Sequence, residues 1–140
     1  MTMSIRNQLP GTVTAVHPGE VMATAKIRLA GGQDLTAAIT LEAVRDLGLS
    51  EGTSVRALVK STEVSLATEH PRHISIRNQL PGTVSDVSSG AAMATVKVAV
   101  DGGGVLTSAI TQESADDLGL KAGDRVVALI KSTEVALTTT

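Results

Sequence analysis

Two sets of polar residues in this sequence combine the side chains that bind small oxyanions. The first set is Ser4, Arg6, Thr40, Lys60 and Ser61, and the second is Ser75, Arg77, Thr111, Lys131 and Ser132. Cationic side chains neutralise an anion, hydroxyl groups donate hydrogen bonds to its oxygens, and a helix N-terminus adds backbone N–H donors. Since neither set contains a carboxylate, each predicts a pocket for a small oxyanion.

Every member of these sets also has a purely structural interpretation. Thr40 stands where a helix is expected to begin, so its hydroxyl could serve only as a cap. Arg6 and Lys60 could simply be charges that water solvates at the ends of strands. The residues alone leave both interpretations open.

The sets occur twice because the chain is a tandem duplication. Ser4–Val13 returns letter for letter as Ser75–Val84, and 39 of the 66 pairs between residues 4–69 and 75–140 are identical. Apolar positions often differ between the copies, as at Ile27 and Val98, whereas the polar sets do not change. The repeat predicts a first domain at 1–69, a linker at 70–74 and a second domain at 75–140.

The pattern within each repeat predicts a small β-domain. In the first copy, Ala23, Ala25, Ile27 and Leu29 alternate with polar residues, as in a half-buried strand. Extended segments are also expected at about 3–16, 34–39, 55–59 and 62–68. Pro10-Gly11 interrupts the first of these, which implies an edge strand or a bulge.

A short helix is expected before the fourth strand. Thr40 is its predicted N-cap, residues 41–47 form it, and Gly48 closes it. Four strands, this helix and a closing fifth strand fit the OB type of barrel. We therefore expect a mainly β protein of two tandem OB-like five-stranded barrels, each with one short helix.

Composition limits the class of protein. The chain has no Phe, Tyr, Trp or Cys. A domain of about 60 residues buries only about 60% of its unfolded surface, so we expect oligomerisation to supply further burial. With a net charge of −2, no signal peptide and no apolar run of about 20 residues, the sequence predicts a soluble cytoplasmic protein without nucleic-acid or membrane partners.

Other candidate residues give weaker signals. His70 and His73 flank Pro71 in the linker, which favours a solvated joint over a metal site, so no bare metal ion is expected. No Ser/His/Asp arrangement survives the repeat, because His17 becomes Ser88. We therefore expect the protein not to be an enzyme.

Two further pairs of residues are unchanged between the copies. Asn7 and Asn78 are interpreted as residues that hold the Pro-Gly bend. Met22 and Met93, where the second strand of each copy begins, are interpreted as core residues or subunit contacts.

The opening motif of each repeat resembles that of a known family. Ser-Ile-Arg-Asn-Gln-Leu-Pro-Gly is similar to the Ser-Ala-Arg-Asn-Gln-Leu-x-Gly motif of the molbindins, small molybdate-binding proteins made of Mop domains; Ile5 and Ile76 replace its Ala. The Gly-Gly hairpin, Ala-Ile-Thr before the helix, Leu-Gly-Leu after it and Lys-Ser-Thr-Glu-Val also match. The resemblance covers almost the whole chain twice, as in the tandem, di-Mop molbindins.

The resemblance implies an assembly and a set of ligand contacts. It implies a homotrimer with molybdate sites between units, contacted by the two polar sets named above. In the related regulators a further serine contributes, which corresponds to Ser114 but to Ala43 in the first repeat, so the two classes of pocket would differ in affinity. Backbone-lined pockets near the threefold axis are expected at Gly19, Glu20, Val21, Met22, Gly90, Ala91, Ala92 and Met93.

The expected function is therefore intracellular molybdate binding for molybdenum storage or homeostasis. Tungstate has the same charge and shape, so the sequence does not separate the two ions. A regulator would carry a helix-turn-helix ahead of Ser4, where we expect no room for one, and a transport ATPase would carry a Walker A motif. An OB-type nucleic-acid binder would use aromatic stacking and a basic groove, which the absence of aromatic residues argues against.

Overall fold

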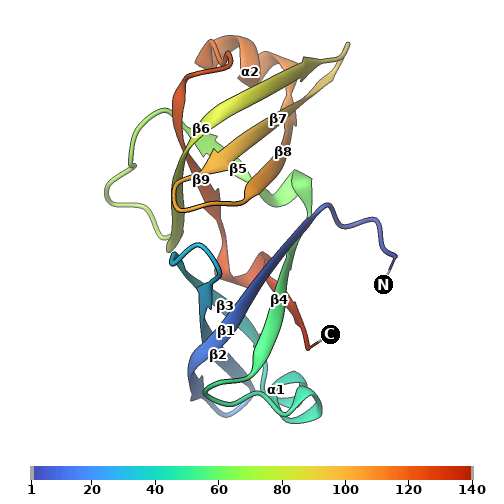
Figure 1. Ribbon diagram of the computed structural model, residues 1–140, viewed down its shortest axis with the longest axis vertical. Coiled ribbons are helices and arrows are strands. Elements are labelled where there is room, and N and C mark those ends of the chain that lie inside the picture. The colour runs from blue at the N-terminus through green and yellow to red at the C-terminus, as the bar shows by residue number, and fades with distance from the viewer. Residues whose placement is uncertain (1, 140) are drawn as a thin grey trace.

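The protein consists of two five-stranded curled sheets placed end to end (Figure 1). This description rests on a computed structural model and covers residues 2–139. The two short helices lie at opposite ends of the long axis, and the repeats meet at the middle (Figure 1). The expected fold class, mainly β with two tandem five-stranded domains, is confirmed.

The two repeats contain the same elements in the same order. The first has β1 (Asn7–Pro18), β2 (Met22–Leu29), β3 (Asp34–Thr40), α1 (Leu41–Leu47), β4 (Ser54–Val59), the 3-10 turn η1 (Ser61–Glu63) and β5 (Ser65–Ala67). The second has β6 (Asn78–Ser89), β7 (Met93–Val100), β8 (Val105–Thr111), α2 (Gln112–Leu118), β9 (Arg125–Ile130), η2 (Ser132–Glu134) and β10 (Ala136–Thr138).

The sequence pattern located the central strands and the helices correctly. Ala23, Ala25, Ile27 and Leu29 are all buried on one face of β2, as their alternation predicted. The Thr40 hydroxyl caps α1 by accepting a 3.1 Å hydrogen bond from the backbone N–H of Ala43. Gly48 ends the helix with a left-handed φ of 63°, a conformation that glycine adopts without steric cost.

Of the two alternatives predicted from Pro10-Gly11, an edge strand or a bulge, the edge strand is wrong. Pro10 lies in β1, which is the middle strand of its sheet, and the bulge comes later, between Val13 and Ala15. Proline is tolerated because the ladder between β1 and β2 begins only at Gly11. The missing N–H of Pro10 therefore falls beyond that ladder, while its carbonyl still accepts a 3.0 Å bond from Ala30 N.

The fifth strands are exchanged between the repeats. We expected each fifth strand to close its own barrel, but β5 pairs with β9 of the second repeat and β10 pairs with β4 of the first. One sheet therefore has the order β10-β4-β1-β2-β3 and the other β5-β9-β6-β7-β8. The sequence repeat and the folded sheet consequently do not coincide at their last strand.

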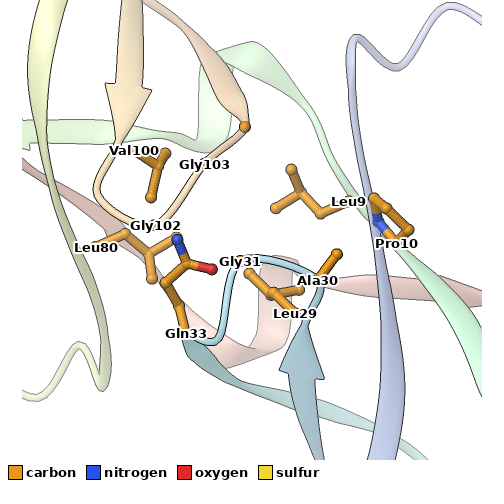
Figure 2. Close-up of a pocket in the computed structure, with 11 residues that line it drawn as sticks. Leu9, Pro10, Leu29, Ala30, Gly31, Gln33, Leu80, Val100, Gly102 and Gly103 are labelled. Atoms are coloured by element: carbon orange, nitrogen blue, oxygen red, sulfur yellow. The ribbon is translucent and has the colours of Figure 1, made fainter.

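Two glycine turns meet where the repeats join. A Cβ atom on Gly31 would lie 2.9 Å from the carbonyl oxygen of Gly102, so the close approach of the backbones requires glycine here. Beside this contact lies a cavity of about 280 Å³ lined mainly by apolar side chains, among them Leu9, Leu29 and Leu80 (Figure 2).

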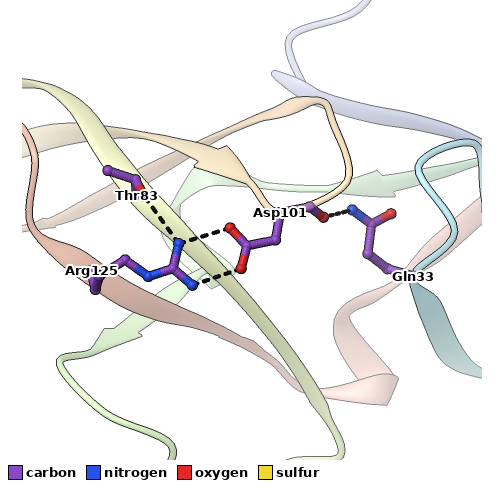
Figure 3. Close-up of polar contacts among 4 residues, drawn as sticks. All are labelled: Gln33, Thr83, Asp101 and Arg125. Carbon is purple, nitrogen blue, oxygen red and sulfur yellow. Dashed lines mark hydrogen bonds and ion pairs between the residues drawn. The ribbon is translucent and has the colours of Figure 1, made fainter.

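A polar network at the same junction joins Gln33 of the first repeat to an ion pair of the second, and it has no counterpart with the repeats reversed. Arg125 donates to both carboxylate oxygens of Asp101, at 2.8 and 2.6 Å, and to the Thr83 hydroxyl at 3.0 Å (Figure 3). The backbone carbonyl of Asp101 accepts a hydrogen bond from the Gln33 side chain of the first repeat. Repeat register places Ala30 at the position of Asp101, so the first repeat has no equivalent ion pair.

The core is built from small aliphatic side chains of both repeats, which form one buried cluster. Some apolar side chains remain exposed in the single chain: Val21 is 72% exposed, and Met22 and Met93 are each 46% exposed. The two methionines are therefore not core residues of one chain. Neither helix within residues 2–139 has the length and apolar character needed to cross a membrane.

Strand exchange predicts which engineered cysteines can form a disulfide. Arg56 lies opposite Thr138 in the ladder of β4 and β10, and directly opposed residues of antiparallel strands lie within disulfide reach. Because the chain has no cysteine, R56C combined with T138C should form an intrachain disulfide under mild oxidation, detected by peptide mapping. Ala67 is the position equivalent to Thr138 in the first repeat, so it would lie opposite Arg56 if the fifth strands were not exchanged. R56C combined with A67C should therefore form no disulfide, and cross-linking of that pair would contradict the exchange.

The ion pair at the junction predicts a pH-dependent contribution to stability. The hydrogen bonds from Arg125 hold the pKa of Asp101 below its ordinary value of 3.8. The pair's stabilisation is therefore complete above pH 3.8 and is lost as the pH falls through the lowered folded-state pKa. D101N should have a lower melting temperature than the parent at pH 7, and the two should converge below that pKa. Asp46→Asn, on the exposed side of α1, is the control. A D101N difference in melting temperature that did not shrink as the pH fell below 3.8 would refute the assignment.

Candidate functional site

Four members of each polar set lie at the junction of the repeats, and we call them the waist sets. The first waist set is Ser4, Arg6, Lys60 and Ser61; the second is Ser75, Arg77, Lys131 and Ser132. The ladder between β1 and β4 ends at the pair of Asn7 and Val59. Arg6 and Lys60 are therefore the next residues on two adjacent strands, and the second repeat repeats this arrangement at Asn78 and Ile130.

The arginines of the waist sets fold back over their own backbone. Arg6 donates from Nε to the Ser4 carbonyl at 3.1 Å and from Nη2 to the Met3 carbonyl at 2.7 Å. Arg77 makes the equivalent bonds to Ser75 and Ile74. Since a guanidinium has five N–H donors, each arginine is fixed in direction while three donors remain for a ligand.

The first waist set contains a buried hydroxyl that is not hydrogen-bonded. The Oγ of Ser61 is shielded from solvent and has no partner among the described residues. A buried polar atom is normally satisfied, and leaving one without a partner costs free energy. The Ser61 hydroxyl therefore lacks the partner that a buried polar atom normally has.

A buried asparagine beside each waist set ties that set to the other repeat. The Asn7 side chain donates to the Thr107 carbonyl and accepts from the Thr107 N–H, both at 2.8 Å. Asn78 makes the same pair of 2.8 Å bonds with Thr36. The interpretation that these residues hold the Pro-Gly bend is wrong, because their amides instead pair with the edge strand of the opposite repeat.

The helix caps do not join the waist sets of the same chain. Thr36 and Thr107 are held at the waist, and Thr40 and Thr111 lie four residues further along β3 and β8, roughly 13 Å away at the rise of a strand. Thr111 caps α2 by accepting from Ser114 N at 3.0 Å and donates to the Ser114 hydroxyl at 2.8 Å. The structural interpretation of these threonines as caps is thus confirmed. The helices that they cap, α1 and α2, lie at the two ends of the molecule, which we call its poles (Figure 1).

The segments expected to line axial pockets also lie at the poles. Gly19 N donates to the Met22 carbonyl at 2.8 Å, which forms a tight turn at the tip of the hairpin of β1 and β2. Met22 pairs with Thr40 in the ladder of β2 and β3, so this turn is beside the cap of α1. The turn from Gly90 to Met93 stands in the same relation to α2.

Charge around the waist is mixed. Among residues 2–139, no carboxylate lies within ion-pair distance of Arg6, Lys60, Arg77 or Lys131. However, Glu63 and Glu134 line a pocket of about 210 Å³ together with Lys60. These two carboxylates, which the sequence sets did not include, lower the positive potential beside Lys60. The described residues contain no group of three His, Asp or Glu side chains that could hold a metal ion.

The fold and the waist together define a class of protein, a tandem pair of small β-domains with a cationic, hydroxyl-bearing set in each repeat. The TOBE domain model matches residues 3–66 and 74–137. The chain belongs to the TOBE domain family and contains two copies of the domain, which confirms the resemblance to the tandem Mop proteins.

The chain is also similar to proteins that handle molybdenum. A crystal structure of ModG, a cytoplasmic molybdate-binding protein, with molybdate bound, covers all of this chain and is itself fully covered, at 42% identity and a TM-score of 0.97. The molybdenum-pterin-binding protein MopB of Rhodobacter capsulatus is 38% identical over 96% of this chain and 50% of its own length. Molybdenum-pterin-binding protein 3 of Clostridium pasteurianum is 46% identical over 47% of this chain and 97% of its own length.

The relatives differ in the share of their own length that this chain matches. The chain spans about half the length of the curated relatives that it matches along nearly its whole length. The single-repeat relative corresponds to one copy of the unit, whereas ModG corresponds to both.

The asparagine bridges predict a large and specific loss of stability. Asn7→Ala removes two hydrogen bonds and leaves the N–H and C=O of Thr107 without these partners. We expect the free energy of unfolding to fall by about 2–4 kcal/mol, since each unsatisfied buried group costs about 1–3 kcal/mol. Chemical denaturation measures this.

Gln8→Ala is the matched control for the asparagine substitution. It removes an adjacent amide whose one side-chain hydrogen bond among residues 2–139, to the Ile5 carbonyl at 3.1 Å, stays within the same segment. We expect it to cost about 1 kcal/mol or less. If both variants lowered the free energy of unfolding by the same amount, the asparagine bridge would contribute no more to stability than a local hydrogen bond.

Proposed function

We propose that this protein is a cytoplasmic molybdate-binding protein that captures the ion reversibly, for molybdenum storage or homeostasis, without converting it. The observation that carries the proposal is the full-length likeness, at 42% identity, to ModG with molybdate bound. Tungstate, with the same charge and shape, is proposed to bind as well. The protein acts as a binding protein and not as an enzyme.

The waist sets are the proposed centre of each site. Arginine and lysine offset the two negative charges, and the serine hydroxyls donate to the oxygens of the tetrahedral ion. The unpartnered Ser61 hydroxyl supports this role, because a bound oxyanion would satisfy it. The backbone bonds of Arg6 also support it, since they fix the guanidinium before the ligand arrives.

The remaining contacts are proposed to come from another copy of the chain. Thr40, Thr111 and Ser114 lie at the poles, too far from the waist sets for one small ion to touch both. A neighbouring chain that sets its pole against the waist would bring the two parts together. The exposed Val21, Met22 and Met93 at the poles support such a contact, because association would bury them.

We propose that the assembly is a homotrimer, with molybdate held between subunits. Further ions are proposed to bind near its axis against the backbone of the turns at residues 19–22 and 90–93. An ion that bridges subunits stabilises the assembled state by RT ln(1 + [L]/Kd), about 2.7 kcal/mol when the ion is at one hundred times its Kd. Binding and assembly are therefore linked.

Native mass spectrometry with molybdate, tungstate and sulfate tests the function. The expected result is a trimer that takes up several molybdate or tungstate ions at concentrations at which sulfate binds poorly. Arg6→Gln combined with Arg77→Gln should weaken molybdate binding by roughly tenfold to a hundredfold, since a hydrogen bond to a charged group is worth about 1.5–3 kcal/mol.

Arg28→Gln is the control for the arginine variants. Arg28 is an arginine of the outer sheet face, paired with Asp34 at 2.6 Å and outside both waist sets. Its substitution should leave molybdate uptake unchanged. A trimer that took up neither molybdate nor tungstate would remove the proposed function while leaving the fold in place.

A further inference from the structure

One buried hydroxyl distinguishes how the two waist sets are held. Ser108 on β8 is fully buried, and its Oγ donates a 2.6 Å hydrogen bond to the carbonyl of Val64. Val64 directly follows η1, the turn that begins after Lys60 and contains Ser61. The edge strand of the second repeat therefore fixes the end of the short segment that carries half of the first waist set.

The second waist set lacks this anchor. With a repeat register of 71, Ser108 corresponds to position 37 (108 − 71) and Val64 to position 135 (64 + 71). Ala37 is also fully buried, but its methyl group has no proton to donate to the Val135 carbonyl. The asparagine bridges do not account for this difference, because each repeat has one such bridge with two 2.8 Å bonds.

We propose that Ser108 is a positioning residue that makes the two waist sets unequal, so that the first binds the oxyanion more tightly than it would without the anchor. The inference rests on the proposed function and adds a determinant of affinity to it. Ser108 does not touch the ligand. It holds the segment that bears Lys60 and Ser61 in the geometry that binds.

The size of the effect follows from the hydrogen bond. A segment that spends only part of its time in the competent geometry binds with a Kd raised by the inverse of that fraction. The anchor cannot favour that geometry by more than the bond itself contributes. The net contribution of one buried hydrogen bond therefore limits the difference to about tenfold in Kd.

Lys60 and Lys131 report on the two sets in the unmodified sequence. Both ammonium groups are exposed in the chain, so each can be labelled by reductive methylation, and bound molybdate should protect each from labelling. Mass spectrometry of the digested protein gives the molybdate concentration at half-protection for each lysine separately. Lys26, on the outer face of β2 and outside both sets, should not be protected.

The variant S108A removes the hydrogen bond to Val64, and A37S introduces the equivalent hydroxyl beside Val135. S108A should raise the half-protection concentration at Lys60 by up to about tenfold and leave Lys131 unchanged. A37S should lower the value at Lys131 and leave Lys60 unchanged. Alanine fits at position 108, since the first repeat already carries a buried alanine at the equivalent place.

The outcomes separate the inference from the proposed function. If molybdate protects neither lysine in the parent protein, the function and the inference both fail. If it protects them but S108A shifts both lysines equally, Ser108 acts only on the fold and the inference is overturned. A shift at neither lysine overturns it as well. Only an S108A variant whose half-protection concentration changes at Lys60 and not at Lys131 supports a positioning role.

Discussion

The pairing of a buried asparagine amide with the edge of the opposite sheet holds the molecule together at its centre. An edge strand has unpaired N–H and C=O groups that must be satisfied or solvated. Asn7 and Asn78 satisfy one residue of each such edge, at Thr107 and Thr36, with the geometry of a strand. Because each asparagine follows a waist arginine, the same bonds that join the repeats also place the cations.

Strand exchange extends this joint into the core. A repeat of this size, without aromatic side chains, cannot enclose much apolar surface alone. With β5 and β10 exchanged, apolar side chains of both repeats form one buried cluster. The repeats therefore cannot unfold independently without exposing each other's interior, which makes two marginal units into one cooperative body.

Local structure could be predicted from the sequence, but the pairing of the repeats could not. Alternation located β2, and Thr40 and Gly48 marked the ends of α1, because these signals depend on neighbouring residues only. The exchange gave no local signal, since Leu66 and Leu137 are identical in repeat register and either strand fits either sheet. Asn7 was noticed as unchanged, yet nothing along the chain indicates that its partner is 100 residues away.

The candidate site was predictable in composition and only partly in arrangement. The hydroxyls and cations were identified together because they do not vary between copies. Their division between waist and poles depends on strand length, which a list of residues does not contain. The spacing of four residues between Thr107 and Thr111 is enough to keep the cap of α2 away from Arg6.

Division of the site has a consequence for a duplicated chain. In a homodimer of single repeats, symmetry would make the two waist sets identical, so any substitution would alter both. Fusion of the repeats removes that constraint. Ser108 and Ala37, or Ser114 and Ala43, can then differ within one molecule while the asparagine bridges, which both sets need, remain the same. The tandem chain thus keeps the symmetric frame of the fold while the proposed sites of its two repeats carry different residues.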